Sequence, residues 1–196
     1  MPLIRDEFIK PDVRLAVWHI TEAVEDFIAP RQLDLSAMHS EFRKKEVLAV
    51  YALLAHMTGK DDLIIGYDET GRPEVLGWKL SISHTKGWAA LILSKTRTVA
   101  IDVEYMSDRV TRVTDRFLRP DEKKGSLFCQ LVSWSAKETV YKLLSEEHLQ
   151  YFEMRIKPFT ESARGRVEVE DLTEPKSVMV DFEINDDFVL TYATGD

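Results

Sequence analysis

The chain has 196 residues, 44% hydrophobic and 31% charged, which is typical of a globular protein with one large core or two smaller ones. Its formal net charge of −8 argues against a general nucleic-acid binder, which would carry a basic surface. The single cysteine, Cys129, excludes an intrachain disulfide and a zinc site made of several thiolates, so we expect a buried thiol.

Neither a signal peptide nor a membrane span is predicted from the hydropathy pattern. Residues 1–10 carry charges throughout and lack the apolar core of a signal peptide. No window approaches the run of about 20 apolar residues that a membrane-spanning helix needs. We therefore expect a cytoplasmic protein.

The first half predicts several strands around one long helix. Residues 13–28 predict a strand over 15–20 and then a short helix. Residues 41–57 repeat apolar side chains at helical spacing, with Ser40 before the run and Gly59 as its end. Two short strands should flank the turn at 71–73, and three longer ones should follow over residues 78–83, 89–94 and 98–104.

The second half predicts helices first and strands afterwards. A helix is expected from about 109 to 117, breaking near Pro120, and a second one from 125 to about 145. The sequence then alternates as strands do over residues 164–172, 176–184 and 187–194. Because both halves combine helices with short antiparallel strands, the predicted fold class is α+β.

Two acidic residues end the apolar strand over residues 98–104. Strands have a period of two, so Asp102 and Glu104 point to the same face. Carboxylates held this close repel unless a cation or a proton lies between them. Hard oxygen ligands suit Mg²⁺, which keeps several waters and also binds substrate phosphate. The alternative is two solvated carboxylates, and the spacing alone favours that alternative.

The helix over residues 125–145 contains the segment WSAKETVYK at 134–142. Glu138 and Lys142 are four residues apart and share a helix face, as do Trp134 and Glu138. Glu138 would supply a third oxygen ligand, and Lys142 would meet phosphate charge. The alternative is a surface Glu–Lys pair worth a few tenths of a kcal/mol. We expect Trp134, Tyr141 and Leu144 to face the core.

Polar donors gather at the end of the strand over residues 78–83. Ser83, His84, Thr85 and Lys86 crowd into a turn before Gly87, a place where phosphate oxygens meet hydrogen-bond donors. A histidine with a purely structural role is the alternative, and the neighbouring donors bring the two interpretations near balance.

Four motifs follow one another along the chain: Gly-Arg-Pro at 71–73, Ser-Ile-Ser-His-Thr at 81–85, Ala-Ile-Asp-Val-Glu at 100–104 and Trp-Ser-Ala-Lys-Glu-Thr-Val-Tyr-Lys at 134–142. In this order and spacing they resemble the 4′-phosphopantetheinyl transferase superfamily, particularly its longer, pseudo-duplicated type that acts on the carrier domains of synthases. Arg-Phe-Leu at 116–118, followed by Glu122, resembles the family's segment between its two acidic motifs. The resemblance covers about residues 40–145.

The resemblance implies a fold of two similar α+β halves, residues 1–97 and 98–196, packed as a pseudo-dimer with the active site in the cleft between them. It implies transfer of 4′-phosphopantetheine from coenzyme A (CoA) to a serine of an apo acyl or peptidyl carrier protein. The reaction would depend on Mg²⁺ and serve fatty acid or secondary metabolite biosynthesis. CoA and the carrier protein would be the partners of a monomer, with no nucleic acid and no membrane.

The same resemblance assigns roles to single residues. Asp102, Glu104 and Glu138 would bind the metal ion that bridges the CoA pyrophosphate. Glu138 would also be the base for the carrier serine, directly or through water, and Lys142 would neutralise charge on the phosphates or the leaving group. The implied CoA contacts are Ser83, His84, Thr85 and Lys86 at the phosphates, including the 3′-phosphate, and Arg72 and Pro73 along the adenosine.

Two departures from the family pattern keep alternatives open. Ala100 stands where the family usually has glycine, and relatives commonly carry a basic residue near Val50-Tyr51. The basic run at 43–45 is the candidate for compensation. One alternative is therefore a weak or inactive relative that binds CoA or a carrier protein. Another is a different metal-dependent phosphotransfer enzyme or nuclease, which would need a basic groove that the net charge does not favour.

Overall fold

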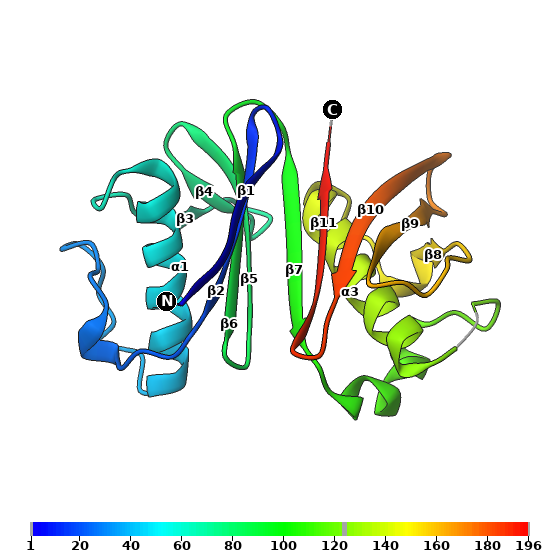
Figure 1. The fold of residues 1–196 in the computed structure, drawn as a ribbon. Coiled ribbons are helices and arrows are strands. Elements are labelled where there is room, and N and C mark those ends of the chain that lie inside the picture. The colour runs from blue at the N-terminus through cyan, green and yellow to red at the C-terminus, as the bar shows by residue number, and fades with distance from the viewer. Residues whose placement is uncertain (1, 123–124, 196) are drawn as a thin grey trace. The chain divides into compact units, whose positions relative to one another are not determined.

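The computed structural model describes residues 2–122 and 125–195 and divides into two compact units, Met1–Val99 and Ala100–Gly195. Each unit combines an antiparallel sheet with helices (Figure 1), so the predicted α+β class is confirmed. The packing of the two halves as a pseudo-dimer stays a prediction.

The first unit is built on a six-stranded sheet of order β1-β2-β6-β5-β4-β3. Its strands are β1 (Leu3–Lys10), β2 (Val13–His19), β3 (Gly66–Tyr67), β4 (Pro73–Val75), β5 (Trp78–Thr85) and β6 (Trp88–Ser94). Helix α1 (Glu41–Thr58) covers one face of this sheet (Figure 1), and the single-turn helix η1 (Val24–Asp26) follows β2.

Helix α1 begins and ends as the sequence predicts. The Ser40 side chain accepts a hydrogen bond from the Arg43 amide at 3.4 Å, and Gly59 ends the helix with a φ of +70°, a conformation that glycine adopts without strain. The apolar side of the helix packs on the sheet and forms one core, which includes Ala49, Leu53, Leu54, Leu80 and Leu91.

The second unit is built on a five-stranded sheet of order β7-β11-β10-β9-β8. Its strands are β7 (Val99–Tyr105), β8 (Met154–Ile156), β9 (Arg164–Asp171), β10 (Lys176–Ile184) and β11 (Phe188–Thr194). The helices are η2 (Asp108–Arg112), α2 (Thr114–Phe117), α3 (Leu127–Leu143), η3 (Ser145–Glu147) and η4 (Tyr151–Glu153). Helix α3, capped by Ser126, packs on β11 and supplies Val132, Ala136 and Val140 to the second core.

The structure corrects three expectations about the elements. The helix predicted from 109 to 117 is two short turns, η2 and α2, and within η2 the Thr111 hydroxyl bonds the Asp108 carbonyl at 2.7 Å. Strands β1 and β8 were not predicted, because β1 is an edge strand whose charged and apolar residues do not alternate regularly between buried and exposed positions, and β8 has only three residues. Tyr141 points outward with 41% of its surface exposed.

Within the ranges that the structure describes, no helix is both long and apolar enough to cross a membrane.

Cys129 is half-buried, and its thiol contacts Glu161 at 3.2 Å. Burial raises the pKa of this thiol above its usual value, which makes it a poor nucleophile.

Candidate active site

Strand β7 and helix α3 bring Asp102 and Lys142 together within the second unit. Asp102 is buried, and its Oδ1 accepts a hydrogen bond from the Lys142 ammonium at 2.8 Å. Its Oδ2 accepts from the Ser135 hydroxyl at 2.8 Å, and Ser135 in turn contacts Thr191 on β11 at 2.8 Å. Lys142 also donates to the Ile101 carbonyl at 3.0 Å. The carboxylate is therefore fixed on both oxygens.

Glu104 lies on the same face of β7 as Asp102, as the strand period predicts. Its Oε1 accepts from the Trp134 indole at 2.8 Å, so α3 holds this side chain as well. Burial, and then the negative charge of Asp102, raise the pKa of Glu104 to about 7. Glu138 adds to this repulsion, while Trp134 and Lys142 oppose it.

Glu138 faces this pair from α3. Its Oε1 accepts a hydrogen bond from the Tyr151 hydroxyl at the start of η4. Burial raises the pKa of Glu138, the charge of Asp102 raises it further, and Tyr151 and Lys142 lower it. Three carboxylates thus interact with one ammonium, which leaves excess negative charge in a partly buried place.

The buried ion pair of Lys137 and Glu122 stabilises the elements that carry the acid cluster. The Lys137 ammonium is fully buried and bonds Glu122 Oε2 at 2.8 Å, the Phe117 carbonyl at 2.7 Å and the Tyr151 carbonyl at 3.1 Å. Lys137 therefore ties α3 to α2 and to the segment that carries Tyr151. Burial lowers the pKa of Lys137, while Glu122 opposes that shift.

The acid cluster suits a divalent cation in its donor chemistry. Carboxylate oxygens are the ligands that Mg²⁺ prefers, and a cation would offset the repulsion that raises the pKa of Glu104 and Glu138. As placed, the described residues offer no group of three His, Cys, Asp or Glu side chains that could hold a metal ion. To bind one ion together, the three carboxylates would have to leave their present contacts with Lys142, Trp134 and Tyr151.

In the first unit, His84 belongs to a second cluster, formed with two residues of α1. Glu46 is almost fully buried, and its Oε2 lies 2.9 Å from Arg43 Nη1 and 3.3 Å from His84 Nδ1. Arg43 and His84 also approach each other to 3.5 Å. Two potential cations therefore converge on one carboxylate.

The other residues expected at the CoA phosphates are distributed over different faces. Leu80 and Ile82 on β5 pack in the α1 core, so the period of two puts His84 on the face that α1 covers. Ser83 and Thr85 then point to the opposite face, where Ser83 is buried. Lys86 is exposed in the turn after β5. Residues 83–86 thus present their side chains in more than one direction.

Arg72 and Pro73 lie at the β3–β4 hairpin. Asp68 Oδ1 accepts from the amides of Thr70 and Arg72 at 2.8 and 3.0 Å, and Gly71 has a φ of +83° that the turn requires. Pro73 pairs with Tyr67 in the hairpin, and Arg72 and Pro73 are both half-buried. The turn predicted at 71–73 is thus explained by local hydrogen bonds, and an adenosine contact there stays a prediction.

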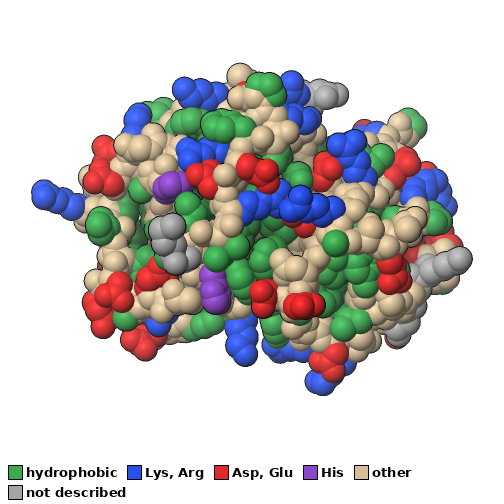
Figure 2. All heavy atoms as spheres, in the orientation of Figure 1, with side chains coloured by type: hydrophobic (Ala, Val, Ile, Leu, Met, Phe, Trp, Pro, Cys, Tyr) green, Lys and Arg blue, Asp and Glu red, His purple; other side chains and the backbone are tan. Residues whose placement is uncertain are grey.

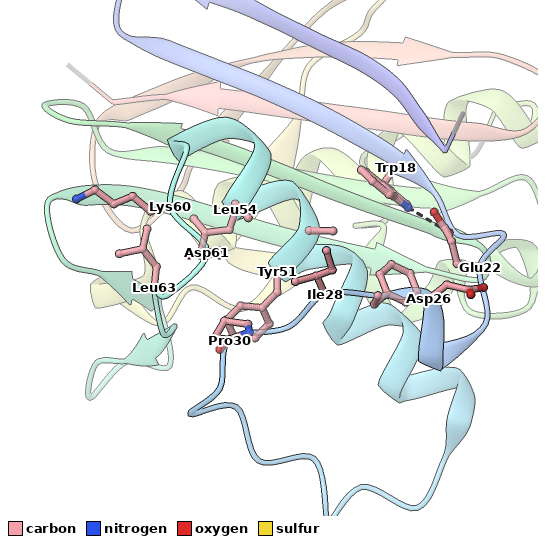
Figure 3. Close-up of a pocket in the computed structure, with 13 residues that line it drawn as sticks. Trp18, Glu22, Asp26, Ile28, Pro30, Tyr51, Leu54, Lys60, Asp61 and Leu63 are labelled. Atoms are coloured by element: carbon pink, nitrogen blue, oxygen red, sulfur yellow. Dashed lines mark hydrogen bonds between the residues drawn. The ribbon is translucent and has the colours of Figure 1, made fainter.

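A pocket of about 350 Å³ in the first unit is lined by Tyr51, one of the two departures from the family pattern (Figure 3). Its walls are mostly apolar, and the Tyr51 hydroxyl accepts from the Ile65 amide at 3.2 Å. Three carboxylates, Glu22, Asp26 and Asp61, line it together with one cation, Lys60. Its charge therefore does not suit a phosphate group.

The other departure, Ala100, is fully buried and belongs to the core of the second unit, so its methyl group has a place in the packing.

Figure 2 shows Lys and Arg side chains interspersed with Asp and Glu over the face in view. Several cations of the second unit are paired: Arg155 with Glu170 at 2.6 Å and Arg166 with Asp181 at 2.8 Å. The charges of these cations are therefore offset by neighbouring acids.

Four residues with clear contacts in the two clusters carried no separate prediction: Glu46, Ser135, Lys137 and Tyr151. Ser135 and Lys137 lie inside the motif at 134–142, so the motif itself was their signal. Glu46 is three residues after Arg43 on a predicted helix, a spacing that places the two side chains on one face. Tyr151 follows a segment without periodicity, and no sequence pattern indicated it.

Residues 98–193 match the family model described as the 4′-phosphopantetheinyl transferase superfamily. The match contains β7, α3 and η4, and therefore every residue of the acid cluster. No curated protein matches the sequence.

Proposed function

From the membership of this chain in the 4′-phosphopantetheinyl transferase superfamily, carried by residues 98–193, we propose that it is a holo-carrier-protein synthase. It would transfer the 4′-phosphopantetheine group of CoA to a serine of an apo acyl or peptidyl carrier protein. The observation that carries the proposal is the cluster of Asp102, Glu104, Glu138 and Lys142 within the matched domain.

The reaction is a phosphoryl transfer, in which a protein contributes mainly positioning and the offset of negative charge. A serine hydroxyl attacks the β-phosphorus of the CoA diphosphate, the bond from that phosphorus to the bridging oxygen breaks, and 3′,5′-ADP leaves. In our proposal Glu138 accepts the serine proton, directly or through water. The pKa of Glu138 is raised, so its carboxylate is a stronger base than that of an ordinary glutamate, as general-base catalysis near neutral pH requires.

Lys142 would meet the charge of the phosphates or of the leaving group, and the contacts of its ammonium with Asp102 and Ile101 hold it beside the acids. Asp102, Glu104 and Glu138 would be the residues that hold Mg²⁺. When bound, the ion supplies charge neutralisation at the phosphate oxygens. Tyr151 would orient Glu138 through the hydrogen bond between them.

CoA recognition would come from the first unit. His84 and Arg43 supply donors for phosphate, and Ser83, Thr85 and Lys86 lie on the same strand end. Arg72 and Pro73 would contact the adenosine. The cytoplasm is the expected place of action, and we propose a monomer.

Mass spectrometry tests the proposal directly. Purified protein is incubated with CoA, Mg²⁺ and a panel of apo acyl and peptidyl carrier proteins. We expect one carrier to gain the mass of a single phosphopantetheine group, while the same carrier with its acceptor serine replaced by alanine gains nothing. A panel without any mass gain, in the presence of measured CoA binding, would instead support the inactive relative.

A further inference from the structure

We infer that Glu46 is a positioning residue, which orients His84 and Arg43 so that both can donate to a phosphate group of CoA. The inference rests on the proposed function, because it concerns the CoA site of that same enzyme. No motif that resembles the family includes Glu46, and the assignment comes from its contacts in the first unit.

The geometry is that of one buried acceptor between a half-buried donor, His84, and an exposed one, Arg43. The Glu46 side chain is 4% exposed, His84 is 28% exposed and Arg43 is 59% exposed. Both donors meet the same oxygen, Oε2, at 2.9 Å and 3.3 Å. Arg43 and Glu46 are three residues apart on α1, and His84 is at the end of β5 on the face that α1 covers. Two separate elements are therefore linked through one carboxylate.

The chemistry of the carboxylate fixes the orientation of the imidazole. An ionised glutamate only accepts hydrogen bonds, so Nδ1 of His84 must carry a proton when it donates to Glu46. His84 would then meet a phosphate oxygen through Nε2, and a hydrogen bond there requires a proton on Nε2 as well. Glu46 thereby holds Nδ1 of the imidazole toward the carboxylate, and the proposed phosphate contact is made by Nε2.

The guanidinium of Arg43 gains in a similar way. A long, mostly exposed side chain loses conformational freedom when it binds a ligand, and a fixed partner on one edge reduces that loss. With Nη1 held by Glu46, the remaining donors of the planar group are available for a phosphate. Arg43 belongs to the basic run at 43–45, so this arrangement would compensate for Tyr51, which lines an acidic and apolar pocket instead.

The sign of the effect separates a positioning role from a simple charge effect. CoA is a polyanion, so a carboxylate that merely lies near it would weaken binding, and its removal would strengthen binding. If Glu46 orients the two donors, its removal weakens binding. The two accounts predict opposite changes for the same substitution.

The experiment compares Glu46→Gln and Glu46→Ala with wild type, and uses Glu41→Gln as the matched control. Glu41 is an exposed glutamate on the same helix. Calorimetry with CoA gives the affinity, steady-state transfer gives KM for CoA and kcat, and ¹H–¹⁵N spectra give the protonated nitrogens of His84. Glu46→Gln keeps the shape of the side chain, so it stays informative if Glu46→Ala fails to fold.

We expect both Glu46 variants to bind CoA about tenfold more weakly, the loss typical of a charge-assisted hydrogen bond. KM for CoA should rise by a similar factor with kcat unchanged, the His84 nitrogen signals should shift, and Glu41→Gln should behave as wild type. Unchanged or tighter CoA binding by Glu46→Gln, alongside weaker binding by His84→Ala, would overturn the inference and leave the proposed function standing. A wild-type protein that binds no CoA would contradict both.

Discussion

The two clusters of this protein use charge in opposite ways. In the first unit, one buried acid, Glu46, lies between the donors of Arg43 and His84, so the exposed side of the cluster is cationic. In the second unit, three carboxylates share one ammonium, and the pKa values of Glu104 and Glu138 rise in response. The first arrangement suits an anionic ligand, and the second suits a cation or a proton. The proposed metal-assisted phosphoryl transfer would use both properties.

The largest expected effect concerns the buried ion pair of Lys137 and Glu122, which supports the second cluster. Among the described ion pairs of the first unit, none has both partners buried to this degree. Lys137→Met leaves Glu122 buried without its ammonium, and the carbonyls of Phe117 and Tyr151 lose their donor. Breaking a buried pair costs about 3–5 kcal/mol, so the free energy of unfolding should fall by that amount. Denaturant melts measure it.

Lys157→Ala is the matched control for Lys137, because Lys157 pairs with Glu170 at the surface. Exposed pairs contribute about 1 kcal/mol or less. If both substitutions lower the free energy of unfolding by the same amount, the buried pair contributes no more to stability than a surface pair.

The next effect separates chemistry from folding. Glu138→Gln keeps the shape and the Tyr151 contact but removes the base and one anionic oxygen, so turnover in Mg²⁺ should fall at least about a hundredfold. Thermal melting should barely change, because a crowded acid contributes repulsion. Glu146→Gln, an exposed glutamate beyond α3, should retain full activity.

Stability should depend on pH through Glu104. Its folded-state pKa of about 7 lies above the ordinary value of 4.5, so the folded protein binds the proton more tightly than the unfolded chain. Stability is therefore greatest below about pH 4.5, as far as this group decides, and is lost as pH rises through 7.

The loss is at most about 3 kcal/mol, from the size of the pKa difference. Metal-free protein in a chelator should thus unfold more easily at pH 8 than at pH 5, and Glu104→Gln should flatten that slope. If metal-free wild type has the same free energy of unfolding at both pH values, repulsion at Glu104 does not affect stability, and this part of the account is wrong.

The smallest effect belongs to the first cluster. His84→Ala should weaken CoA binding by about 1–3 kcal/mol in calorimetry, since one charge-assisted hydrogen bond is lost. His56→Ala is the control, because His56 is an exposed histidine of the same unit that pairs with Asp6 at 2.8 Å. If both variants bind CoA as wild type does, His84 has a structural role.

The sequence predicted the parts of both clusters that depend on local periodicity. Asp102 and Glu104 share a strand face, Glu138 lies one turn from Lys142, and α1 ends at Gly59. It could not predict contacts between distant segments, such as Trp134 with Glu104 or Tyr151 with Glu138, because no spacing rule links residues across a fold. The expected inward position of Tyr141 was wrong for a related reason: helical period alone does not say how wide the buried face is.

The central claim is that the first cluster binds CoA and the second performs the transfer. Single-turnover transfer to one apo carrier protein, followed against CoA concentration for wild type, His84→Ala and Glu138→Gln, tests it most directly. The account predicts that His84→Ala reaches the wild-type rate at saturating CoA, whereas Glu138→Gln stays at least about a hundredfold slower at every concentration. A wild-type rate in Glu138→Gln, or a His84→Ala rate that stays low at saturation, would contradict this division of roles.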